Sequence, residues 1–156
     1  MAAPFDTPYR GGFAGLEPHF ALTVYFEDTD AFGVVYYPNY LRFMERARSD
    51  MILATGVDHF ERFKQDGATY VVAEVQIRYH RSARVGETIM VVSTVEQVRA
   101  ASVIIQQRVM RGTEMLTEGR VTAAFVTPDG RPQRQPKEWV EAFKAVAGNH
   151  GKDVQA

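Results

Sequence analysis

Three carboxylates and a helix start lie close together near the N-terminal end of the sequence. The carboxylates belong to Glu27, Asp28 and Asp30, and Gly33 follows as a residue that permits the tight backbone path of a turn. Pro38 favours a helix start, because its missing N–H would be unsatisfied in the first helical turn in any case. The N–H groups at a helix start point outward and favour negative charge. A carboxylate beside these N–H groups is an arrangement that suits acyl transfer. The same residues are equally typical of an acidic turn that only caps a core helix.

The hydrophobic pattern predicts the elements that hold this turn in place. Residues alternate from Phe20 to Phe26, which predicts a strand that runs into the acidic turn. Apolar or small side chains then recur at helical spacing from Tyr40 to Ala54, which predicts a long amphipathic helix that ends at Gly56. A short helical segment is expected over 57–65. Four strand-like runs and a terminal helix complete the pattern: Tyr70–Tyr79, Thr88–Val98, Ser102–Met110, Thr117–Thr127 and Lys137–Val146.

The order strand, helix, four strands predicts an α+β fold. The links among the last three strands are short, as expected for an antiparallel meander, and the apolar face of such a sheet must be covered. The long helix, which begins near Tyr37 to Asn39, is the element available to cover it, so we expect a curved antiparallel five-stranded sheet wrapped around one central helix. This single domain is expected to span residues 19–147, between a flexible N-terminal tail, 1–18, and a flexible C-terminal tail, 148–156.

Composition narrows the class of protein and its location. The chain has 156 residues, of which 46% are hydrophobic and 24% charged, as in one soluble globular domain. Its formal net charge of -1 provides no basic field for nucleic acid. Cysteine is absent, which excludes disulfides and thiolate chemistry and makes the cytoplasm the simplest location. Neither membrane insertion nor a bound metal is expected, because no segment has the roughly 20 apolar residues of a membrane-spanning helix and no two histidines have the spacing of a helical metal site.

The acidic turn and the helix start also carry a family resemblance. Residues Asp28 to Tyr40 read D-T-D-A-F-G-V-V-Y-Y-P-N-Y. They resemble the D-x-D-x-x-G-x-V-x-[YH]-x-x-Y pattern of hotdog-fold acyl-CoA thioesterases of the 4-hydroxybenzoyl-CoA thioesterase type, including the Tol-Pal-associated branch. The resemblance extends over roughly 20–143. It implies a hotdog fold, hydrolysis of an acyl-CoA to free CoA and a carboxylic acid, no cofactor beyond the CoA of the substrate, and a homodimer or homotetramer with active sites between subunits.

The resemblance assigns roles by position. It implies that Asp30 is the catalytic carboxylate, as nucleophile or general base, and that the backbone N–H of Tyr37 polarises the thioester carbonyl. It implies that a neighbouring subunit contributes the stretch around Val72 to the pocket. The expected substrate contacts are Phe32, Gly33, Val34, Val72 and Arg99, with Arg99 facing the CoA phosphates and Arg81, Arg84 and Arg131 as alternatives for that task.

Three residues depart from the pattern of the family and leave the acyl group open. Phe32 stands where a small residue is usual, Tyr37 where the Tol-Pal branch often has histidine, and His80 where that branch tends to have an aliphatic residue. Phe32 would either narrow the acyl pocket or stack on an aromatic acyl group. An alternative function is a non-hydrolytic module that binds acyl-CoA or an acyl carrier protein on the same scaffold.

Overall fold

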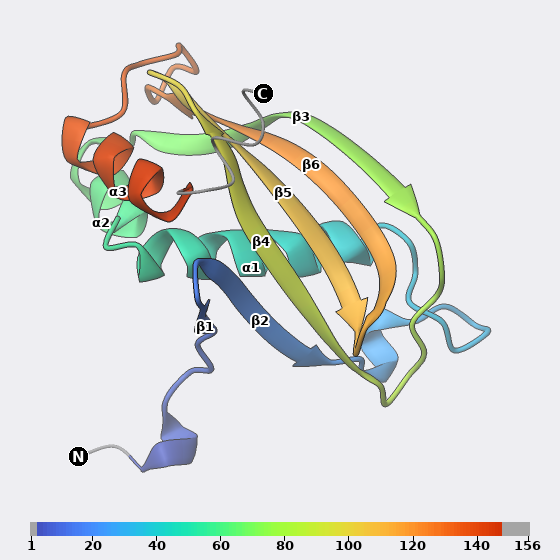
Figure 1. Cartoon of the computed structure of the whole chain (residues 1–156). Coiled ribbons are helices and arrows are strands. Elements are labelled where there is room, and N and C mark those ends of the chain that lie inside the picture. The colour runs from blue at the N-terminus through green and yellow to red at the C-terminus, as the bar shows by residue number, and fades with distance from the viewer. Residues whose placement is uncertain (1–2, 148–156) are drawn as a thin grey trace.

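A six-stranded antiparallel sheet curves around helix α1 (Asn39–Ala54), which lies along its concave face (Figure 1). The computed structural model describes residues 3–147, and the predicted C-terminal tail, 148–156, lies outside them. The strands run in the order β1-β2-β4-β5-β6-β3 across the sheet. Their bounds are Gly12–Ala14 (β1), Glu17–Thr23 (β2), Thr69–Tyr79 (β3), Thr88–Val98 (β4), Ser102–Arg111 (β5) and Glu114–Val126 (β6). The remaining helices are η1 (Pro4–Asp6), η2 (Phe26–Asp28), α2 (His59–Asp66) and α3 (Lys137–Ala147).

The predicted α+β architecture is confirmed, with six strands where the sequence predicted five. The additional strand, β1, lies in the segment predicted as a flexible tail, and β2 begins there too, at Glu17. Contacts outside the segment explain this order: the Gly11 N–H donates to a carboxylate oxygen of Asp50 on α1 (3.0 Å), and the ring of Tyr9 packs edge-on against Phe20 (5.2 Å between centroids). The residues before β2 are therefore tied to both the helix and the sheet.

The first long strand also ends earlier than predicted. The alternation from Phe20 to Phe26 predicts extended backbone throughout, but β2 ends at Thr23 and residues Phe26–Asp28 form the short helix η2. Here the Asp28 carboxylate accepts a hydrogen bond from the Tyr25 N–H (2.8 Å). This local side-chain bond offers the backbone an alternative to the sheet ladder.

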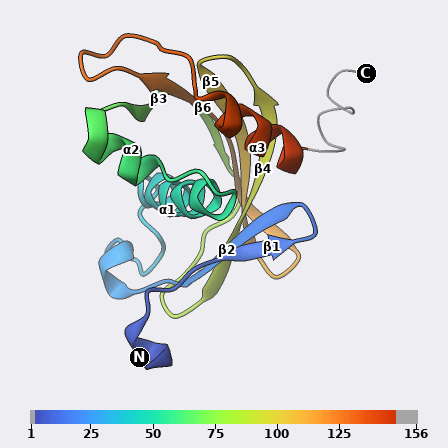
Figure 2. The same ribbon diagram turned by 90° about the vertical axis from the view of Figure 1, so that its left-hand side faces the viewer.

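The core lies between α1 and the sheet, as the helical spacing of apolar residues predicts. Figure 2 looks along α1 and shows it on one side of the sheet, with α2 beside it. One buried cluster joins Tyr40, Phe43 and Met44 of α1 to β4, β5 and β6. A second joins the C-terminal half of α1 to α3, where Phe143 is fully buried. These two clusters fix the helix along its length, and with it the turn that enters the helix.

A buried polar network crosses from α1 to β5 inside this core. Arg48 is only 6% exposed, and its guanidinium donates to Gln107 Oε1 (2.9 Å) and pairs with Glu45. Gln107, which is 0% exposed, donates in turn to the Met44 carbonyl (2.9 Å) and to Ser93 Oγ (3.0 Å). Gln107 therefore gives the buried Arg48 guanidinium an acceptor on the sheet side, in addition to its ion pair with Glu45.

We expect Gln107→Leu to destabilise the fold. The substitution keeps the approximate volume but removes one of the two acceptors of the Arg48 guanidinium and leaves the Met44 carbonyl and the Ser93 hydroxyl without the Gln107 amide. The expected cost is about 2 to 3 kcal/mol in the free energy of unfolding. Urea denaturation measures this cost. Gln106→Leu is the matched control, because Gln106 is the exposed neighbour on the same strand. Equal stability of the two variants would contradict the prediction.

Candidate active site

The turn that contains Asp30 joins η2 to α1 and is closed by its own hydrogen bonds. Asp30 Oδ1 accepts from the N–H groups of Phe32 (2.8 Å) and Val34 (3.4 Å), and the Asp30 N–H donates to the Val34 carbonyl (2.9 Å). Gly33 has a φ of 77°, the left-handed conformation that glycine adopts without steric cost. Within residues 3–147, Asp30 Oδ2 accepts no hydrogen bond. The turn thus fixes the carboxylate through one oxygen and leaves the other available.

Helix α1 begins directly after this turn, where Pro38 was expected to start it. The Asn39 N–H donates to the Tyr36 carbonyl (2.8 Å), and the Asn39 side-chain amide donates to the Asp28 carbonyl (2.8 Å), so the helix start and the acidic turn are tied together. Pro38 has no N–H. The Tyr37 N–H has no acceptor among the residues that the structure describes. A free backbone donor therefore lies at the positive end of the helix dipole.

The tyrosines of this region divide into a buried and an exposed group. Tyr40 is buried, its hydroxyl accepts from the Ala83 N–H (3.0 Å), and desolvation raises its pKa. Tyr37 is exposed and packs edge-on against Tyr79 at the end of β3 (5.8 Å between centroids). Phe32 is 85% exposed, so in a single chain it lines no closed pocket. Because Tyr37 contacts Tyr79, the segment that contains Asp30 and Tyr37 lies beside the C-terminal end of β3.

A largely apolar pocket lies at the other end of β3. It has a volume of about 400 Å³ and is lined by residues of α1, α2 and the start of β3, including Ile52, His59, Phe60, Phe63 and Val72. Burial lowers the pKa of His59 below its ordinary value, which favours the neutral ring. The α2 residues were not predicted as part of a site, although Phe60 and Phe63 have the spacing of one helical face.

The structure separates the predicted site residues into two groups. Asp30, Phe32, Gly33, Val34 and Tyr37 share one turn and the helix start that follows it. Val72 and Arg99 lie at the opposite end of the sheet, where the start of β3 and the β4–β5 turn both flank the end of β6. Val72 and Tyr79 are seven positions apart, or about 23 Å along an extended strand. Within one chain, Val72 and Arg99 are therefore too far from Asp30 to contact the reacting group of the same small ligand.

The described part of the chain contains neither a metal-binding cluster nor a membrane-spanning helix. No three His, Asp or Glu side chains among residues 3–147 lie close enough to hold a metal ion. No helix in the same range is long and apolar enough to cross a membrane. The Asp30 turn and the apolar pocket are therefore the features from which a site is built.

The central helix, the curved sheet and the acidic turn together define a hotdog-fold thioesterase. The thioesterase superfamily model matches residues 32–118. The acyl-CoA thioesterase YbgC of Haemophilus influenzae is 36% identical over 125 residues, which cover 80% of this chain and 92% of that protein. The chain therefore belongs to the thioesterase superfamily, as an acyl-CoA thioesterase of the hotdog fold. The predicted family and enzyme class, a thioester hydrolase, are confirmed.

Solved structures confirm the fold at lower sequence identity. A DHNA-CoA thioesterase from Staphylococcus aureus has a TM-score of 0.80 at 23% identity and covers 88% of this chain and 95% of its own. The 4-hydroxybenzoyl-CoA thioesterase from Pseudomonas sp. strain CBS-3 has a TM-score of 0.75 at 18% identity and covers 81% of this chain and 98% of its own. The predicted hotdog fold is thereby confirmed.

Proposed function

We propose that the chain hydrolyses acyl-CoA thioesters with Asp30 as nucleophile or general base and the Tyr37 N–H as oxyanion donor. The observation that carries this proposal is the pairing of two unused groups on one short segment. Asp30 Oδ2 and the Tyr37 N–H both lack a partner within residues 3–147. Both lie on the segment that leads into α1, and the Asn39 side chain ties the start of that helix to the turn through the Asp28 carbonyl. A carboxylate and a donor for developing negative charge are the two groups that thioester hydrolysis requires.

The proposed reaction needs no metal. In one route the Asp30 carboxylate attacks the thioester carbon, the C–S bond breaks, the thiolate leaves, and water hydrolyses the resulting anhydride. In the other route Asp30 takes a proton from water, the water oxygen attacks the same carbon, and the proton passes to the departing thiolate. In both routes negative charge builds on the carbonyl oxygen. A backbone donor such as the Tyr37 N–H lowers the barrier by about 3 kcal/mol, and the helix dipole acts in the same direction.

A second copy of the chain would bring the acyl pocket to Asp30. Strand β3 forms one edge of the sheet, and the large apolar side chains exposed along it are Val71, Val72, Val75 and Tyr79. An open edge of this kind favours pairing with another strand. If two β3 strands pair antiparallel about a two-fold axis, the start of each strand lies beside the end of the other. The apolar pocket around Val72 would then face Asp30 of the partner subunit, which supports the predicted homodimer.

The CoA phosphates require cations near the pocket mouth, and two exposed arginines are suited to this task. Arg99 lies at the same end of the sheet as Val72 and would therefore lie near Asp30 of the partner subunit in the proposed dimer. Arg84 belongs to the β3–β4 loop and pairs through its backbone with Val34. The contribution of Arg99, the homotetramer and the cytoplasmic location all stay predictions.

A panel of short-chain, long-chain and aromatic acyl-CoAs tests the proposed activity. We expect release of free CoA from at least one of these classes, with saturation kinetics. The chain has no cysteine, so a thiol reagent detects released CoA without background from the protein. The alternative, a non-hydrolytic module that binds acyl-CoA or an acyl carrier protein, predicts saturable binding in calorimetry with no CoA released from any substrate.

A further inference from the structure

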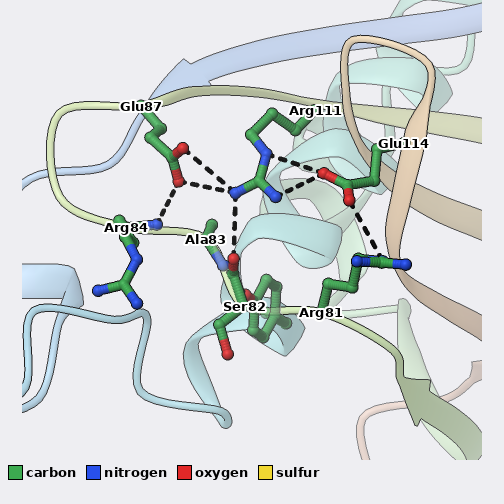
Figure 3. A network of polar contacts seen from close by, with 8 residues as sticks. Arg81, Ser82, Ala83, Arg84, Glu87, Arg111 and Glu114 are labelled. Carbon is green, nitrogen blue, oxygen red and sulfur yellow. Dashed lines mark hydrogen bonds and ion pairs between the residues drawn. The ribbon is translucent and has the colours of Figure 1, made fainter.

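A network of charged side chains centred on Arg111 holds the β3–β4 loop, residues 80–87 (Figure 3). Arg111 is the last residue of β5, and its Nη1 donates to both carboxylate oxygens of Glu87 (2.9 and 3.2 Å) and to the Ser82 carbonyl (3.1 Å). Its Nε and Nη2 donate to Glu114 Oε1 (3.1 and 2.5 Å). Glu114 pairs in addition with Arg81 (3.2 Å). All three guanidinium nitrogens of Arg111 are therefore used.

These charges are partly shielded from water, which strengthens the network. The side chains of Arg111 and Glu87 are each 31% exposed, so their attraction is screened less than that of a fully exposed pair. Hydrogen bonding to Arg111 holds the pKa of Glu114 below its ordinary value. In Figure 3 the Arg84 backbone N–H donates to Glu87 Oε1 (2.5 Å), while the Arg84 side chain extends away from the network.

The loop that Arg111 holds is hydrogen-bonded to the turn that contains Asp30. The Val35 N–H donates to the Ala83 carbonyl (2.9 Å), and the Val85 N–H donates to the Gly33 carbonyl (3.1 Å). The Ala83 N–H donates to the Tyr40 hydroxyl on α1 (3.0 Å). The loop thus contacts the chain on the segment between Asp30 and Tyr37 and again in the first turn of the helix.

The loop also contacts the chain ahead of Asp30. The Gly86 N–H donates to the Val24 carbonyl (2.8 Å), and the Val24 N–H donates to the Glu87 carbonyl (2.9 Å). The Glu87 side chain at the same time accepts a hydrogen bond from Arg111. The backbone on both sides of Asp30 is therefore hydrogen-bonded to this loop. The His80 and Arg81 N–H groups fix the start of the loop on the Leu116 carbonyl (2.8 and 3.0 Å), and Arg111 fixes its later part through Ser82 and Glu87.

We propose that Arg111 is a positioning residue of the thioesterase site, which acts through residues 80–87 to fix Asp30 relative to the Tyr37 N–H. This inference rests on the proposed function. A displacement of about 1 Å at a reacting group reduces rate by up to about 100-fold, so a loop that borders the Asp30–Tyr37 segment affects turnover without touching substrate. The planar guanidinium reaches two carboxylates and one carbonyl at once, a geometry that a lysine ammonium does not reproduce.

The test compares Arg111→Gln and Arg111→Lys with a matched control on the same strand. Arg108→Gln removes one ion pair, with Glu17 (2.7 Å), at a similar side-chain exposure of 36%, and none of its contacts involves residues 80–87. We expect Arg111→Gln to lower kcat about tenfold with KM close to the wild-type value, and Arg111→Lys to give an intermediate kcat because it keeps one charge. Rates are taken well below the unfolding transition, so that a loss of stability alone leaves kcat unchanged.

A double variant shows whether Arg111 acts through Asp30. In the Asp30→Asn background, adding Arg111→Gln is expected to change the residual rate little, because the group that Arg111 positions is already lost. Wild-type kcat in Arg111→Gln, an equal loss in Arg108→Gln, or a full additional loss in the double variant would each overturn the positioning role. Full activity of Asp30→Asn alone would instead overturn the proposed function, so the two failures are distinguishable.

Discussion

Asp30→Asn is expected to reduce kcat by about 100- to 10,000-fold, the range typical of losing an acid–base or nucleophilic group. The amide keeps an oxygen that can accept from the Phe32 N–H, which donates to Asp30 Oδ1 at 2.8 Å in the wild type. The turn should therefore retain its shape, and substrate binding should be affected much less than turnover. Steady-state release of CoA on the best substrate of the panel measures the change.

Asp28→Asn is the control for this result. Asp28 lies two residues away, and its carboxylate accepts from the Tyr25 N–H (2.8 Å), a bond that an amide oxygen also makes. We expect this variant to keep nearly full activity, because Asp28 caps the turn and takes no part in the chemistry. If Asp30→Asn hydrolysed every substrate as fast as the wild type, or if the two variants lost activity equally, Asp30 would not be the catalytic carboxylate.

Val75→Arg is expected to separate the subunits and to remove activity with them. Val75 is near the middle of the exposed stretch of β3, so a two-fold pairing of β3 strands would bring two cations close together at the axis. The separated subunit would keep Asp30 but lose the pocket of its neighbour, and kcat/KM should fall about 100-fold or more. Sedimentation velocity measures the mass, and CoA release measures the activity of the same sample.

Leu16→Arg is the matched control for the subunit interface. Leu16 is an exposed apolar residue of similar accessibility, in the turn between β1 and β2 at the opposite edge of the sheet. The same added charge at that edge should leave both mass and activity unchanged. A wild-type protein that sediments as a monomer, or a monomeric Val75→Arg variant with full activity, would contradict the interfacial site.

The sequence was sufficient where the signal is local. Pro38 and the helical spacing of apolar residues placed the start of α1 correctly, and the four later strands were predicted with bounds within three residues of those observed. The Asp30 turn was predicted because its residues are adjacent and Gly33 marks the left-handed position. Each of these features depends on neighbours in the chain, so the residue types alone contain the information.

The features that were missed depend on partners far away in sequence. Strand β1 has three residues, too few for an alternation to be recognised, and the residue before it is tied to Asp50, which lies 39 positions further along the chain. Arg48 is buried against Gln107, which lies 59 residues further along the chain. The Arg111 network joins the β3–β4 loop to the β5–β6 turn. No periodicity in the sequence indicates such pairs, because the sheet topology brings them together.

The difference between the two edges of the sheet limits how many copies can associate through it. Strand β3 offers 11 residues for pairing, whereas β1 at the opposite edge offers only three. Very short edge strands are poor templates for adding another chain. In the proposed dimer, pairing at β3 would use the same surface of both copies and would be complete after two, because neither copy presents a second long edge. We expect the short N-terminal strand to disfavour open-ended strand addition, and with it the fibrous aggregation that would follow.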